Sequence, residues 1–85
     1  MTGEQMLHSA ARLLEDRRNS YGDPARSMAA IAARWSLTLG QPVTPAQVAL
    51  CLIDLKLTRL AHDPAHWDSL RELAGYAAVL REVVR

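Results

Sequence analysis

The sequence is poor in cysteine, has almost no excess of charge of either sign, and contains no long apolar run. Cys51 is the only cysteine, so no disulfide can form within the chain. In the apolar segment 48–53 its free thiol behaves as a small hydrophobic group. Ten basic and nine acidic residues leave a net charge of +1, so charge gives no support to DNA or RNA binding.

Targeting signals and common catalytic motifs are missing as well. Residues 1–5 contain neither a basic region nor a long apolar region, and no apolar stretch approaches the roughly 20 residues that span a bilayer. We therefore expect a cytoplasmic protein with no membrane segment. The sequence has no phosphate-binding loop, nucleophile triad or Gly-rich dinucleotide turn, so none of these motifs identifies a catalytic site.

The composition is that of a folded domain. The 85 residues are 49% hydrophobic and 22% charged, which is typical of a globular chain and not of a disordered one. A chain of this length is long enough for one core and too short for two. We therefore predict a single domain that spans residues 1–85.

Three short signals divide the chain into helices. Each has Asp or Thr followed by Pro and Ala. Proline is tolerated at the first helical position and the residue before it caps the exposed amides, so each signal predicts the start of a helix. They lie at residues 23–25, 44–46 and 63–65. Together with an amphipathic first segment, they predict an all-α four-helix domain with helices at about 4–19, 24–39, 45–61 and 65–84.

The third predicted helix is apolar on nearly every side from Ala46 to Leu60, which is typical of a helix that is buried all round. Three other helices can hardly cover it in so small a bundle. We therefore expect a homo-oligomer, most simply a dimer, in which a partner subunit covers part of this helix. In the fourth helix, Gly75 costs about 1 kcal/mol relative to alanine, so it marks either a close helix approach or a ligand.

Charged residues interrupt these apolar helices and need partners, because burying an unpaired charge is costly. The third helix carries Asp54, Lys56 and Arg59, and the fourth carries Asp68, Glu72 and Tyr76 at a spacing of four. Two interpretations stay open. The carboxylates of Asp68 and Glu72 hold a hard cation such as Mg2+ together with water and substrate phosphate, or they pair with Lys56 and Arg59 in an interhelical salt-bridge network, which spacing alone favours.

Other polar and aromatic residues have a structural and a functional interpretation. Tyr21 and Asp23, with Tyr76, are candidates for a pocket at the start of the second helix, where backbone amides favour anions. A helix cap and a packed tyrosine explain the same loop, and this interpretation is favoured because Asp23 already serves as a cap. His62 and His66 lack a third metal ligand and are expected on the surface. Trp35 and Trp67 are expected in the core.

Taken together, three motifs resemble a small phage and prophage family of unknown function. They are Arg17-x-x-x-Tyr21-Gly22-Asp23-Pro24, then Lys56-x-x-Arg59, then Asp68-Ser69-Leu70-x-Glu72-x-x-Gly75-Tyr76-Ala77. More remotely, the chain is similar to nucleotide-modification-associated phage domains and to MazG-like all-helical pyrophosphohydrolases. That resemblance implies an oligomer that binds nucleoside triphosphates and, if it is an enzyme, cleaves them to monophosphate and pyrophosphate with Mg2+.

The sequence departs from the MazG-like pattern on both helices: one acid is missing from the first motif, and in the second Asp68 is one position out of step. The pattern has Glu-x-x-Glu on one helix, which falls near Cys51 and Asp54, and Glu-x-x-Asp on a later helix, which falls near Ser69 and Glu72. Two hypotheses therefore remain. The first is a phage-type domain that binds or hydrolyses nucleotides, with Mg2+ on Asp54, Asp68 and Glu72 and with Lys56 and Arg59 at the phosphate. The second is a non-enzymatic oligomeric adaptor in phage assembly, packaging or regulation.

Overall fold

The computed structural model describes all 85 residues and consists of four α-helices without a strand. The helices are α1 (Gly3–Tyr21), α2 (Pro24–Leu39), α3 (Pro45–His62) and α4 (Trp67–Val84). The all-α fold class predicted from the sequence is thus confirmed. None of the four helices is long and apolar enough to cross a membrane.

Two of the proline signals begin helices in the expected way. Pro24 and Pro45 are the first residues of α2 and α3. The Asp23 side chain accepts a hydrogen bond from the amide of Ala25 at 3.2 Å, and Thr44 exchanges hydrogen bonds with Gln47 in a capping box. These contacts satisfy amides that have no partner inside the helix.

The third signal has a different role from the one predicted. Asp63 ends α3 and accepts a hydrogen bond from the amide of Ala65 at 3.2 Å, and residues 64–65 form a turn. The helix α4 begins at Trp67, and its N-cap is His66, whose Nδ1 accepts from the amide of Ser69 at 3.2 Å. The prediction that α4 begins near Ala65 was therefore wrong by two residues, and His66 is a half-buried cap instead of a surface residue.

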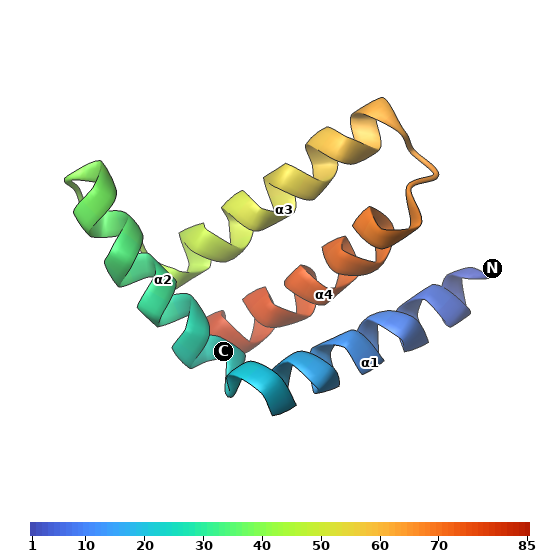
Figure 1. Ribbon diagram of the computed structural model, residues 1–85, viewed down its shortest axis with the longest axis horizontal. Coiled ribbons are helices and arrows are strands. Elements are labelled where there is room, and N and C mark those ends of the chain that lie inside the picture. Colours follow the sequence, from blue (N-terminus) through green and yellow to red (C-terminus); the bar gives the residue numbers. More distant parts are fainter.

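The helix α4 is the centre of the arrangement. Figure 1 shows α3 and α4 as an antiparallel pair, with α1 along the other side of α4 and α2 crossing one end. Accordingly, α4 contacts each of the other three helices, and α3 packs most extensively against it, whereas α1 and α3 do not touch. The capping signals predicted the number of helices but not which of them is central.

The core is small and lies where α2, α3 and α4 meet. It consists of Met28, Ala32, Val48, Ala49 and Val79, and 9 of the 85 residues are buried. Within one chain α3 is covered only in part, as expected for so small a bundle: Val48 and Ala49 are buried, but Leu50, Leu55 and Leu57 are 48%, 51% and 48% exposed. The reason is that α3 has only α2 and α4 as neighbours.

Candidate ligand pocket and ion-pair cluster

A cavity of about 650 Å³ lies between the end of α1, the start of α2, and the facing sides of α3 and α4. Most of its wall is apolar and is formed by side chains from all four helices, among them Leu13, Leu14, Met28, Ile31, Leu52 and Val79. Ligand pockets in proteins typically enclose about 300 to 1,000 Å³ and combine an apolar wall with a few polar groups. The cavity is therefore large enough for a small organic molecule.

The turn between α1 and α2 forms one end of this cavity. Only two residues separate the helices, and Gly22 adopts φ 84°, in the positive-φ region that side chains disfavour. Its amide donates to the carbonyl of Arg18 at 2.9 Å, which ends α1. The sharp reversal leaves Tyr21 at the rim with 77% of its surface exposed.

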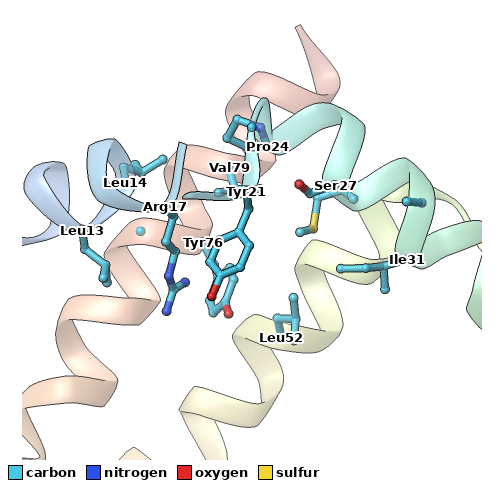
Figure 2. Close-up of a pocket in the computed structure, with 14 residues that line it drawn as sticks. Leu13, Leu14, Arg17, Tyr21, Pro24, Ser27, Ile31, Leu52, Tyr76 and Val79 are labelled. Carbon is cyan, nitrogen blue, oxygen red and sulfur yellow. The ribbon is translucent and has the colours of Figure 1, made fainter. Parts of the chain in front are cut away.

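The polar groups of the cavity lie together. Arg17, Tyr21 and Tyr76 all line it, and the Arg17 guanidinium lies 5.5 Å from the centre of the Tyr76 ring. Figure 2 shows the guanidinium and both phenol oxygens directed toward the same side of the pocket, away from Pro24. A guanidinium over a tyrosine ring is attracted by the ring electrons, so the Tyr76 ring helps to hold Arg17 in place.

Next to these polar groups, Glu72 forms ion pairs with two basic side chains. Its Oε2 lies 2.8 Å from Lys56 Nζ, and its Oε1 lies 3.6 Å from a guanidinium nitrogen of Arg17. The Lys56 side chain is 11% exposed and that of Glu72 is 21% exposed, whereas that of Arg17 is 39% exposed. We call Arg17, Lys56, Glu72 and Tyr76 the Glu72 cluster. It joins α1, α3 and α4.

The charge of Glu72 is stabilised by its neighbours. Burial raises the pKa of this carboxyl, but the hydrogen bond and charge of Lys56, and the charges of Arg17 and Arg71, outweigh that effect, so the pKa lies below its ordinary value. Arg71 is itself paired with Asp68 at 3.2 Å. At neutral pH the cluster therefore has two positive charges and one negative charge.

Gly75 borders the same cavity. It is buried and lines the pocket, yet a Cβ placed on it would meet no other atom within 4 Å. Of the two explanations offered for this glycine, close helix approach is contradicted by that open space. A side chain at position 75 would occupy part of the cavity.

The predicted magnesium ligands are not brought together within one chain. Glu72 pairs with Lys56, and Asp68 is exposed and pairs with Arg71. Asp54 lies two residues before Lys56, about 200° around α3, so it is exposed on the side that faces away from Glu72. No group of three or more His, Cys, Asp or Glu side chains is placed to hold a metal ion. As arranged, these residues do not fit a shared Mg2+, and the magnesium site stays a prediction.

The other predicted site residues separate into two groups. Tyr21 and Tyr76 line the cavity, whereas Asp23 caps α2 and is not part of the wall. Arg59 is exposed and lines a separate small hollow near His62 and His66. Sequence reasoning gave Arg17 no role, although its spacing of four from Tyr21 places both residues on one face of α1.

Comparison with known proteins places the chain in a family. Residues 5–84 match the model of a domain of unknown function, DUF6378. The chain belongs to this family. The match covers nearly the whole chain, including all four helices apart from the first two residues of α1.

The relatives of the chain include phage proteins. It is 32% identical over 81 residues to the Gene 55 protein of Mycobacterium phage D29, covering 94% of this chain and 54% of that protein. It is 32% identical over 80 residues to the Gene 55 protein of Mycobacterium phage L5, covering 92% and 51%. The chain thus spans about half the length of these relatives. No solved structure matches it. The predicted relationship to a phage family of unknown function is confirmed.

Proposed function

We propose that this chain binds a small anionic ligand of the nucleotide class in the cavity at the α1–α2 corner. The observation that carries the proposal is the placement of Arg17 together with Tyr21 and Tyr76 on the wall of a largely apolar cavity of about 650 Å³. The apolar wall and the tyrosine rings suit a planar base, since bases stack on aromatic side chains. The guanidinium suits a phosphate, which it can bind through two N–H donors.

The charge of the cluster supports an anionic ligand. Glu72 lies 2.8 Å from Lys56 and 3.6 Å from Arg17, so Arg17 shares its one counter-ion with a closer cation and the cluster keeps an excess positive charge. Leu52, Ile31 and Met28 give the cavity an apolar wall, and an ionic contact beside apolar surface is stronger than one in open water. An arriving phosphate would supply the missing negative charge.

The proposal concerns binding and includes no hydrolytic step. Cleavage of a nucleoside triphosphate with Mg2+, as the resemblance to MazG-like enzymes implies, needs acidic ligands around the metal. Asp54, Asp68 and Glu72 are not gathered in this way within one chain. Hydrolysis is therefore a separate outcome, measured by the appearance of monophosphate and pyrophosphate when Mg2+ is added.

The test is a binding titration with a matched control. Adenosine, AMP, ADP, ATP and the deoxynucleoside triphosphates are titrated by calorimetry, with and without Mg2+, into the wild type, Arg17→Gln and Arg12→Gln. Arg12 is exposed on the same helix and belongs to none of the ion pairs. We expect phosphorylated ligands to bind more tightly than adenosine, and Arg17→Gln to weaken them about tenfold or more.

Two results would overturn this function. One is the absence of binding by any nucleotide at millimolar concentration. The other is an equal loss of affinity in Arg17→Gln and Arg12→Gln, which would show that the effect comes from net charge and not from the cavity.

A second candidate function is favoured by the surface of α3. We infer a homo-oligomeric interaction module in which a second copy covers the outer face of α3, defined by Leu50, Cys51, Asp54, Leu55 and Leu57. All five residues are exposed. The three leucines would be costly to leave in water, because each buried CH₂ group contributes about 0.8 kcal/mol.

The total surface supports a second copy as the occupant. The chain exposes 5894 Å², whereas a compact monomer of 9.4 kDa exposes about 5,000 Å². The excess of about 900 Å² is close to the roughly 800 Å² that each partner buries in a standard interface. The radius of gyration of 13.5 Å likewise exceeds the value of about 12 Å for a compact chain of this length.

Sedimentation velocity tests this interface. We expect the wild type to sediment as a dimer or higher oligomer at micromolar concentration. The double variant Leu50→Gln/Leu57→Gln should shift it to monomer, whereas Leu7→Gln, at an exposed leucine of α1, should not. A monomeric wild type, or a double variant that associates as well as the wild type, would contradict the second candidate.

A further inference from the structure

In the Glu72 cluster, Lys56 and Arg17 compete for the Glu72 carboxylate, and Lys56 is the closer of the two. One carboxylate serves two cations, and Lys56 approaches it more closely than Arg17 does, at 2.8 Å against 3.6 Å. Lys56 is also the more buried of the two, with 11% of its side chain exposed against 39% for Arg17. Glu72 is thus held mainly by Lys56, and Arg17 is left with a contact too long for a hydrogen bond.

Arg17 is held by a group that leaves its hydrogen-bond donors available. The guanidinium lies 5.5 Å from the centre of the Tyr76 ring, and such a contact uses the charge of the group but few of its N–H donors. A guanidinium has five N–H donors in a planar fork. Its closest approach to Glu72 is through one nitrogen, so most of the fork is free to face the cavity that Arg17 lines.

We propose that Lys56 is a positioning residue for the ligand site and that Glu72 is a built-in competitor for the ligand's anionic group. Lys56 holds Glu72 at close range and so keeps it from pairing fully with Arg17. The inference rests on the proposed function, because it assumes that the anionic group binds Arg17. Lys56 and Glu72 would then set the affinity of that site and the ligand charge that the site prefers.

The sign of each effect follows from Coulomb interactions between groups a few ångströms apart. Without the Lys56 charge, Glu72 would move onto Arg17 and occupy the donors that the ligand needs. Without the Glu72 charge, Arg17 would face no competitor, and the ligand would no longer be repelled by a nearby carboxylate. Removing the two partners of one ion pair therefore changes affinity in opposite directions.

The cluster also sets a preference for ligand charge. With two cations and one carboxylate it has a net charge of +1, which matches one anionic group at Arg17. A ligand with several negative charges is attracted by Arg17, but Glu72 repels it more strongly than it repels a ligand with fewer charges. The repulsion is larger for ATP than for AMP, so removing the Glu72 charge should tighten ATP more than AMP.

The experiment measures the dissociation constants of AMP and ATP, without metal, for four proteins. These are the wild type, Glu72→Gln, Lys56→Met and the double variant. We expect Glu72→Gln to tighten ATP by about tenfold and AMP by less, and Lys56→Met to weaken both by about tenfold. The double variant, in which both the competitor and its holder are gone, should bind ATP at least as tightly as the wild type. Lys56→Arg, which keeps the positive charge, should stay close to the wild type.

A second measurement needs no ligand and guards against loss of folding. Urea denaturation first shows that each variant is folded, and the Arg17 Nε–Hε resonance is then followed by NMR. In Lys56→Met that resonance should shift as Glu72 closes on Arg17, and in the double variant it should return toward the wild-type position. If the Lys56–Glu72 salt bridge has a purely structural role, no variant should bind any ligand more tightly than the wild type does.

The outcomes separate the two proposals. If no protein of the set binds AMP or ATP, the proposed function fails and this inference fails with it. If the wild type binds and Glu72→Gln binds ATP no more tightly than the wild type does, the inference fails while the proposed function stands. The same holds if Glu72→Gln and Lys56→Met change affinity in the same direction.

Discussion

The two faces of α3 are built in opposite ways. The inner face, toward α4, places Lys56 with 11% of its side chain exposed against Glu72, whereas the outer face leaves Leu50, Leu55 and Leu57 about half exposed. Folded domains usually keep charges outside and leucines inside. Within one chain, Glu72 compensates the inner charge, whereas the outer leucines are left without a partner. The proposals give the inner pair a role in ligand affinity and the outer leucines a second copy as their partner.

The largest expected effect contrasts a buried residue with an exposed one on the same helix. Val48 is fully buried and Leu57 is 48% exposed. Val48→Ala removes two buried carbons and leaves a cavity, so it should lower the free energy of unfolding by about 2 kcal/mol. Leu57→Ala, studied at a concentration where the protein is monomeric, should cost less than about 1 kcal/mol. Urea denaturation measures both, and equal losses would break the contrast between the two faces.

The next effect concerns the Lys56–Glu72 pair and its dependence on pH. Glu72 has a lowered pKa in the folded protein, so its contribution to stability is present above the pKa of the unfolded chain, near 4.3, and is lost as pH falls through the folded pKa. In Lys56→Met the fold should lose about 1 kcal/mol at pH 7, because Arg17 replaces only part of the interaction.

The pH profile provides the check on that prediction. The difference in unfolding free energy between the wild type and Lys56→Met should shrink as pH falls through the lowered pKa of folded Glu72, because the protonated carboxyl no longer attracts Lys56. A difference that is constant from pH 7 to pH 3 would show that Lys56 stabilises the fold through packing of its aliphatic stem and not through Glu72.

A smaller effect of opposite sign is expected at Gly75. Because a Cβ there meets open space, Gly75→Ala should raise the free energy of unfolding by about 0.5 to 1 kcal/mol through helix propensity. The added methyl group would also reduce the cavity, so nucleotide affinity should fall in the more stable protein. A matched control is Ala77→Gly, at an exposed position of α4, which should destabilise the helix without affecting the ligand. Gly75→Ala that binds as well as the wild type would argue against this cavity as the site.

The smallest perturbation uses Cys51, which lies on the outer face of α3 and is exposed in the single chain. If a second copy covers this face, the thiol should react more slowly with a thiol reagent as protein concentration rises, and the Leu50→Gln/Leu57→Gln variant should react fast throughout. No substitution at the cysteine itself is needed. A reaction rate that does not depend on concentration would leave the outer face uncovered.

Much of the fold could be predicted from local signals, because Pro24 and Pro45 each follow a capping residue and start a helix. The third start was misplaced because Asp63-Pro64-Ala65 has the same local pattern but forms a turn after α3. Histidine is not among the preferred caps, so the role of His66 had no clear signal. The hydrophobicity of α3 predicted that one chain could not cover it on every side, but it did not show that only α2 and α4 are its neighbours.

The candidate site could be predicted only in part, for a geometric reason. Spacing within one helix fixes which residues share a face, so the pairing of Glu72 with Lys56 was one of the two arrangements considered. Spacing does not fix how one helix is rotated relative to another. Asp54 was therefore grouped with Glu72 although it lies on the far side of α3, and Arg17 was overlooked because its partners are on other helices.

The most direct test of the ligand pocket is a backbone amide NMR titration of the wild type with ATP. We expect shifts at Gly22 and Gly75, which line the cavity, with no change at Leu50 and Leu57 on the outer face of α3. Repeating the titration with Arg17→Gln should remove most of the shift. Shifts confined to the outer face of α3, or no shifts at all, would contradict the assignment of the cavity as the nucleotide site.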